Sequence, residues 1–94
     1  MSKPGSTRVR VRHVVARRPD GTHFLMFDKL EGDVTARDVL FSPSGDEWVV
    51  FAPAFVSGKG NDAVISVTIK PRNPTQLLHP GDLLASRAAI EKSP

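Results

Sequence analysis

The chain has 94 residues, a net charge of +3, 39% hydrophobic residues and no cysteine. This length fits one domain with a modest core, and a cysteine-free chain forms no disulfides and does no thiolate chemistry. No apolar run reaches the roughly 20 residues that cross a bilayer, and residues 1–6 lack the apolar stretch of a secretion signal. We therefore expect a cytoplasmic protein without membrane contact.

The charge is distributed unevenly along the chain. Residues 1–18 contain six bases and no acid, whereas residues 19–62 contain eight acids and three bases. A basic first segment on an acidic-to-neutral body predicts one electropositive face.

Strict alternation predicts that the first strand spans residues 8–17. In "TRVRVRHVV", Val9 and Val11 would face a core while the arginines between them face solvent. "RRPDG" is typical of a turn, so a second strand over residues 22–28 would complete a hairpin.

Further short strands separated by turns are expected in the middle of the chain. "KLEGDVTARDVLF" breaks into short extended pieces, and "EWVVFAPAFV" is a long strand. Pro53 should fall at a bulge or on an exposed edge of that strand, because proline donates no hydrogen bond. "SGKGND" would form a loop before the alternating strand "AVISVTIK".

The last part of the chain combines a tight turn with a short final segment. In "LLHPGDLLAS", Pro80 sets φ, Gly81 takes a positive φ and Asp82 bonds to the turn backbone, while the flanking leucines enter the core. Residues 87–94 would be a tail or one helical turn. No internal repeat of useful length is evident.

Together these elements predict an all-β fold, a small closed or partly open barrel of about six strands. We expect one domain over residues 8–86, preceded by a flexible arm at residues 1–7.

Three segments of the sequence share glycine or aspartate turns followed by apolar residues, namely "LEGDVTARDVLF", "GNDAVISVTI" and "LLHPGDLLAS". Their order resembles domain II of the translational GTPases, the β-barrel module of elongation factor Tu and its relatives. The matching positions are Gly21, Thr22, Gly32, Val34, Asp38, Val39, Asn61, Asp62, Ala63, Val64, Ile69, Leu78, Gly81, Asp82 and Leu84. Arg37 and Phe24–Phe27 depart from the pattern, which has glycine and small residues there. The resemblance implies the barrel without its GTPase domain and transfers no binding residue.

The arginines of the first segment are the candidate binding site. Alternate side chains of a strand lie about 6.6–6.8 Å apart on one face. Arg8, Arg10 and Arg12 could therefore follow a phosphate backbone, with Arg17 and Arg18 extending the row. Alternatively, these arginines are solvated or paired with acids and only discourage edge-to-edge association of the sheet. Base stacking is not expected, because the chain has no tyrosine and its phenylalanines read as core.

No catalytic residue, metal site or cofactor is predicted, and we expect no enzyme. The histidines lack metal-ligand spacing, although His13 and His23 could face each other across the first hairpin. The acids lack the spacing of a calcium loop, and "SGKGND" lacks the pattern of a phosphate-binding loop. No serine occupies a nucleophile motif, and Trp48 reads as a core or rim residue.

Two functions remain open. The first is a small non-catalytic binding module whose basic strand contacts RNA or a ribonucleoprotein, with an affinity that falls as salt rises. The second is a structural or interaction barrel that docks on another protein or forms a homo-oligomer. "WVVFAPAFV" or "LLASRAAI" would supply its apolar contact.

Overall fold

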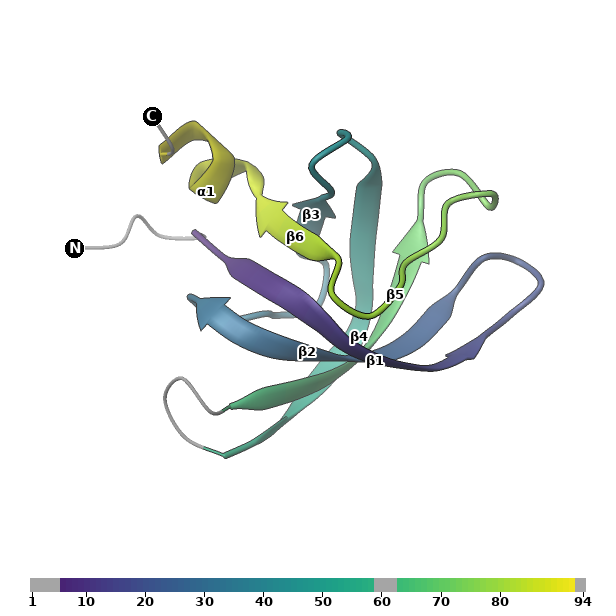
Figure 1. Ribbon diagram of the computed structural model, residues 1–94, viewed down its shortest axis with the longest axis horizontal. Coiled ribbons are helices and arrows are strands. Elements are labelled where there is room, and N and C mark those ends of the chain that lie inside the picture. The colour runs from purple at the N-terminus through teal and green to yellow at the C-terminus, as the bar shows by residue number, and fades with distance from the viewer. Residues whose placement is uncertain (1–5, 59–62, 93–94) are drawn as a thin grey trace.

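A ring of antiparallel strands forms the body of the protein (Figure 1). The computed structural model describes residues 6–58 and 63–92, so residues 1–5 of the expected arm, 59–62 of the expected loop and 93–94 lie outside it. The elements are β1 (Arg8–Arg17), β2 (His23–Glu31), β3 (Val39–Phe41), β4 (Glu47–Ser57), β5 (Val64–Pro71), β6 (Leu83–Ser86) and α1 (Arg87–Lys92). Their order in the ring is β1-β2-β5-β4-β3-β6, and β6 pairs back onto β1. The predicted small all-β fold of about six strands is confirmed.

Apolar side chains from all six strands fill the ring. Val9 and Val11 are 0% and 1% exposed, as the alternation predicts. Trp48 is equally buried, and its ring meets the His23 ring at 82° with centroids 5.0 Å apart. The core consists of Val9, Val11, Leu25, Phe27, Val34, Leu40, Trp48, Val50, Ile65, Val67, Ile69, Leu78 and Leu84.

Two bulges interrupt the alternation of β1. The register with β2 shifts at Arg12 and again at Val15, and each of these residues is an extra one on β1. Strict alternation would bury Val15, but Val14 packs against the core instead and Val15 is 61% exposed. The bulges therefore decide which later side chains of β1 face outward.

The chain folds as two equivalent halves, β1–β3 and β4–β6, related by a pseudo-two-fold axis. Exchanging the two halves reproduces the same ring order. The registers also correspond, because Val9 pairs with Leu84 of β6 just as Trp48 pairs with Leu40 of β3.

The halves also share their bulges. The register between β4 and β5 shifts at Phe51, in the position that Arg12 occupies in β1. A second shift, between Ala52 and Phe55, contains Pro53. The prediction that this proline falls at a bulge is confirmed, because a residue without an N–H fits where the ladder is interrupted.

The "HPGD" turn has the predicted geometry. Gly81 has a φ of 95°, the Asp82 N–H donates to the His79 carbonyl (3.0 Å), and the Asp82 carboxylate accepts the His79 N–H (2.8 Å). Only one leucine of each flanking pair, Leu78 and Leu84, is buried, because alternation sends its neighbour to the outer face.

The first half contains the same turn as "TARD". The Asp38 N–H donates to the Thr35 carbonyl (3.2 Å), and the Asp38 carboxylate accepts the Thr35 N–H (2.8 Å). Arg37 stands in the place of Gly81 and has a φ of 75°. This left-handed conformation favours glycine, so the turn imposes strain on an arginine.

The two ends of the described chain lie together at one end of the ring (Figure 1). The Ser86 N–H donates to the Thr7 carbonyl (2.8 Å), and the Thr7 N–H donates to Ser86 Oγ (2.9 Å). Ser6 and Thr7 are buried, and Ala89 anchors α1 with 0% exposure. No helix within residues 6–58 and 63–92 is long and apolar enough to cross a membrane.

Candidate nucleic-acid interface

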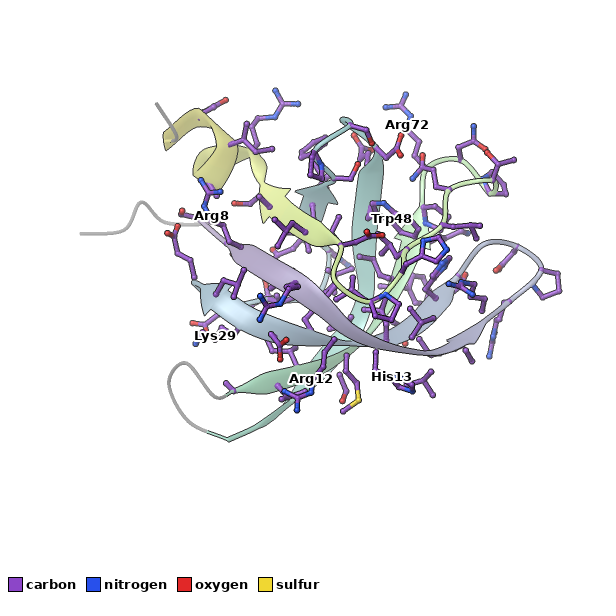
Figure 2. The ribbon with its side chains drawn as sticks, viewed as in Figure 1. Arg8, Arg12, His13, Lys29, Trp48 and Arg72 are labelled. Atoms are coloured by element: carbon purple, nitrogen blue, oxygen red, sulfur yellow. The ribbon has the colours of Figure 1, made fainter. Side chains whose placement is uncertain are left out.

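Arg10 and Arg12 project from the outer face of β1 and share one carboxylate. Arg10 pairs with Asp28 of β2, and its Nη2 lies 3.5 Å from Asp28 Oδ2. The bulge brings Arg12 Nη1 to 3.0 Å from Asp28 Oδ1, and Figure 2 shows Arg12 outside the ring. The two arginine side chains are 50% and 58% exposed, so a single carboxylate leaves this part of the face positively charged.

Arg8 is directed to the helix rather than into a row with Arg10 and Arg12. Its Nη2 donates to the Ala89 carbonyl of α1 at 2.7 Å, and Figure 2 shows its side chain at the end of β1 next to that helix. This hydrogen bond holds α1 against β1. The expected row of three guanidinium groups is therefore reduced to two.

Arg17 is exposed but does not extend the row either, because the second bulge places it opposite His23. It pairs with the buried His23, and its Nε lies 3.2 Å from His23 Nε2. Its Nη2 also donates to the Leu78 carbonyl at 2.7 Å. Arg17 thus ties β1 to β2 and to the segment before β6.

His23 is a buried, neutral imidazole with a defined tautomer. Its Nδ1 donates to the Gly21 carbonyl at 2.7 Å, which leaves Nε2 to accept from Arg17 and from the Leu78 N–H at 3.3 Å. Burial is the main cause that lowers the pKa of His23, and the nearby charge of Arg17 acts in the same direction. Protonation would turn Nε2 into a donor that faces the Arg17 and Leu78 donors. His23 therefore stabilises the fold in its neutral form.

A second group of cations surrounds two phenylalanines on the same outer face. The Arg18 guanidinium lies 5.0 Å from the Phe24 ring centroid, within the range of a cation–π contact. Phe51 is 69% exposed, and Arg18, Phe24, Phe51 and Lys70 line a hollow of about 330 Å³, the Phe51 hollow. The expectation that the phenylalanines are core residues is wrong for Phe24, Phe41 and Phe51, which do not belong to the core cluster. The bulge of β4 turns the Phe51 ring outward.

Asp20 is the acid among the residues that line the Phe51 hollow. Its Oδ1 accepts the Thr22 N–H at 2.9 Å and so closes the turn between β1 and β2. This hydrogen bond is the main cause that lowers the pKa of Asp20, and the charges of Lys70 and Arg18 lower it further. The carboxylate is therefore ionised, and with two cations beside it the hollow keeps a net positive charge.

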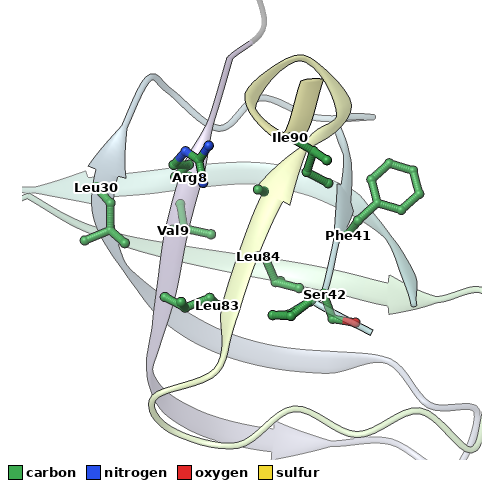
Figure 3. Close-up of a pocket in the computed structure, with 10 residues that line it drawn as sticks. Arg8, Val9, Leu30, Phe41, Ser42, Leu83, Leu84 and Ile90 are labelled. Carbon is green, nitrogen blue, oxygen red and sulfur yellow. The ribbon is translucent and has the colours of Figure 1, made fainter. Parts of the chain in front are cut away.

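An apolar groove of about 250 Å³ lies where β1, β3, β6 and α1 meet (Figure 3). Leu30, Leu83 and Ile90 border it and are 45%, 47% and 46% exposed. The groove includes part of "LLASRAAI", one of the two segments expected to contact a partner. In the other segment, "WVVFAPAFV", Trp48 lies in the core and Phe51 lies on the outer face.

The histidines do not form the weak pair considered from the sequence. His13 lies opposite Met26 and His23 lies opposite Arg17, because the two bulges displace the register of the hairpin. Within the described ranges, no three or more histidines, cysteines or acids gather where they could hold a metal ion.

Sequence reasoning missed the Phe51 hollow, although one signal pointed to it. An unbroken apolar run reads as a strand buried on both faces, which hides an outward ring. Pro53 lies two residues after Phe51, and its need for a bulge indicates that the alternation of this strand is interrupted.

No protein-family model matches the chain, and no curated protein or solved structure matches it either.

Proposed function

We propose that this chain is a non-catalytic module that binds nucleic acid, alone or within a ribonucleoprotein, and that it works in the cytoplasm. The observation that carries the proposal is the pair Arg10 and Arg12, half exposed and balanced by one carboxylate. Arg18 and Lys70 add two cations on the same outer face. Exposed cations distributed over one face of a sheet suit the repeating phosphates of a nucleic acid.

The turn geometry supports a relation to the barrel of the translational GTPases. Arg37 replaces the glycine of the family's turn, yet its φ of 75° keeps the left-handed backbone found at Gly81. In such a relation the chain corresponds to the barrel module of these proteins, which favours binding over catalysis.

The test replaces Arg10 and Arg12 together with alanine and leaves Arg8 intact, because Arg8 holds α1. The affinity for a labelled RNA oligonucleotide should fall. The slope of log K against log salt should become shallower by up to about 2, since two phosphate contacts are lost. Fluorescence anisotropy titrations at several salt concentrations measure both quantities.

Two single variants serve as controls. Asp28→Asn removes the carboxylate that competes for both arginines, so it should raise the affinity. Arg72→Ala removes a 77% exposed arginine that contacts Glu47 and lies away from Arg12 (Figure 2), so the affinity should change little. An affinity that the double substitution leaves unchanged would contradict the proposal.

The apolar groove favours a second candidate, which is assembly of the barrel with itself. Leu30, Leu83 and Ile90 are large apolar side chains left half exposed around one hollow. Sedimentation over a range of concentrations should then show an association that Ile90→Asp abolishes. A monomer at every concentration would exclude self-assembly.

A further inference from the structure

The relation between the two halves provides an internal control for the Phe51 hollow. The registers make Phe51 the equivalent of Arg12, since each is the extra residue of its bulge. They also make Lys70 the equivalent of Asp28, since each pairs with the residue two positions before the bulge. The same two backbone positions can therefore be compared on both strands.

The two pairs of side chains behave differently. Arg12 and Asp28 form an ion pair at 3.0 Å, so the cation at this position of the first half has a carboxylate beside it. In the second half the ring of Phe51 is 69% exposed, and Lys70 forms no ion pair with any residue that the structure describes. The first bulge therefore carries an arginine that shares a carboxylate, and the second carries an exposed ring beside a lysine that no described carboxylate pairs with.

Packing within the chain does not explain why Phe51 is exposed. A phenylalanine ring contributes one of the largest apolar surfaces that a small core can bury. Here the bulge holds the ring outside, near a second ring, Phe24, that is covered by Arg18 at 5.0 Å. The ring of Phe51 and the cation of Lys70 are thus both available to a ligand.

This combination matches the chemistry of unpaired nucleotides. Bases stack on exposed aromatic rings while neighbouring cations hold the phosphates, and this recognition tolerates different sequences. A duplex keeps its base faces stacked inside the helix, so it can meet the cations but not the ring of Phe51.

We propose that the Phe51 hollow receives an unpaired nucleobase, which stacks on Phe51 while Arg18 and Lys70 hold the adjacent phosphates. This inference rests on the proposed nucleic-acid binding and narrows it to single strands. The strand would continue across the outer face toward Arg12 and Arg10, which act as phosphate contacts beyond the hollow.

The experiment compares Phe51→Ala, Phe51→Trp and the unmodified chain for binding a single-stranded oligonucleotide and the matching duplex. Phe51→Ala should weaken single-strand binding by about tenfold or more and leave duplex binding nearly unchanged. Phe51→Trp should retain single-strand binding because indole stacks at least as well. Val15→Ala is the matched control, since Val15 is a 61% exposed apolar residue at another bulge.

A second variant tests the cation. Lys70→Gln should weaken binding of both ligands and make the salt dependence of single-strand binding shallower by about 1. Thermal unfolding checks that each variant folds, which we expect because both side chains are on the outer face.

The outcomes separate this inference from the proposed function. If Phe51→Ala weakens both ligands equally, or neither, while the Arg10 and Arg12 double variant still weakens binding, the stacking site is wrong and nucleic-acid binding stands. If the unmodified chain binds no oligonucleotide, the proposed function fails and the stacking site fails with it.

Discussion

The two halves of the barrel share their turns and registers but carry different side chains at their bulges. Leu40 and Leu84 occupy equivalent buried positions, and the turns before them have the same hydrogen bonds. At the bulges, by contrast, the first half carries an ion pair and the second an exposed ring. Closing the ring requires apolar side chains at the buried positions and the same hydrogen bonds in the turns. Side chains at outward positions do not affect closure, so they can differ between the halves and can bind a ligand.

The largest expected effect comes from substitutions that test whether the two halves contribute equally to the core. Leu40→Ala and Leu84→Ala each remove a side chain that is at most 2% exposed, so each should lower the free energy of unfolding by about 2–5 kcal/mol. Urea titrations measure both losses. Leu77→Ala, at a 56% exposed neighbour of the last turn, should change stability by less than about 0.5 kcal/mol. A large loss at only one of the two core leucines would break the equivalence.

A pH-dependent difference is expected where one half buries an imidazole. His23 occupies the position that Ile65 fills in the other half. Because burial lowers the pKa of His23, its stabilising contribution is complete above the ordinary value of 6.5 and is lost as the pH falls from there toward the lowered pKa. The loss amounts to about 1.4 kcal/mol for each unit by which the pKa is lowered.

Urea titrations from pH 7 down to about pH 5 would reveal this loss. His23→Leu should be less stable at neutral pH, because it leaves the Gly21 carbonyl and the Nε–H of Arg17 without their partner. Its stability should nevertheless vary less over the same pH range. An equal slope in the variant would assign the pH dependence to other groups.

The smallest effects should have opposite signs in the two turns. Gly81→Ala should lower stability by about 1 kcal/mol, because a Cβ meets no atom there and only the positive φ opposes it. Arg37→Gly should raise stability by up to about 1 kcal/mol, since relief of the left-handed strain exceeds the added freedom of the unfolded chain. Differential scanning calorimetry of both variants would detect these shifts. Changes of the same sign would show that the turns are not equivalent.

Alternation and turn residues were sufficient to predict the strands and the fold. Val9 and Val11 are buried and Gly81 has a positive φ, because these properties depend on residues a few positions apart. The repeat was not predictable in this way. Its halves share turn hydrogen bonds and registers but few residue identities, and an arginine in one turn replaces the glycine of the other.

The candidate site was predictable only in part. Arg10 and Arg12 face outward as the alternation implies. Arg17 is exposed but bonds to His23 and to the Leu78 carbonyl, because a bulge that the spacing of the arginines does not reveal shifts its register. The exposure of Phe51 depends on the bulge in the register between β4 and β5, and β5 is distant in sequence. Whether an arginine meets a carboxylate likewise depends on cross-strand register, as Asp28 shows.

The contact between Thr7 and Ser86 has a consequence for chain connectivity. The pseudo-two-fold axis relates this junction to the loop that joins β3 to β4, because Ser42 is the equivalent of Ser86. A circular permutant opened within residues 42–46, with α1 kept inside the new connection between Ser86 and Thr7, would place β4–β6 ahead of β1–β3. It is expected to close the same ring, since each junction connects two strands that pair with each other, β6 with β1 and β3 with β4.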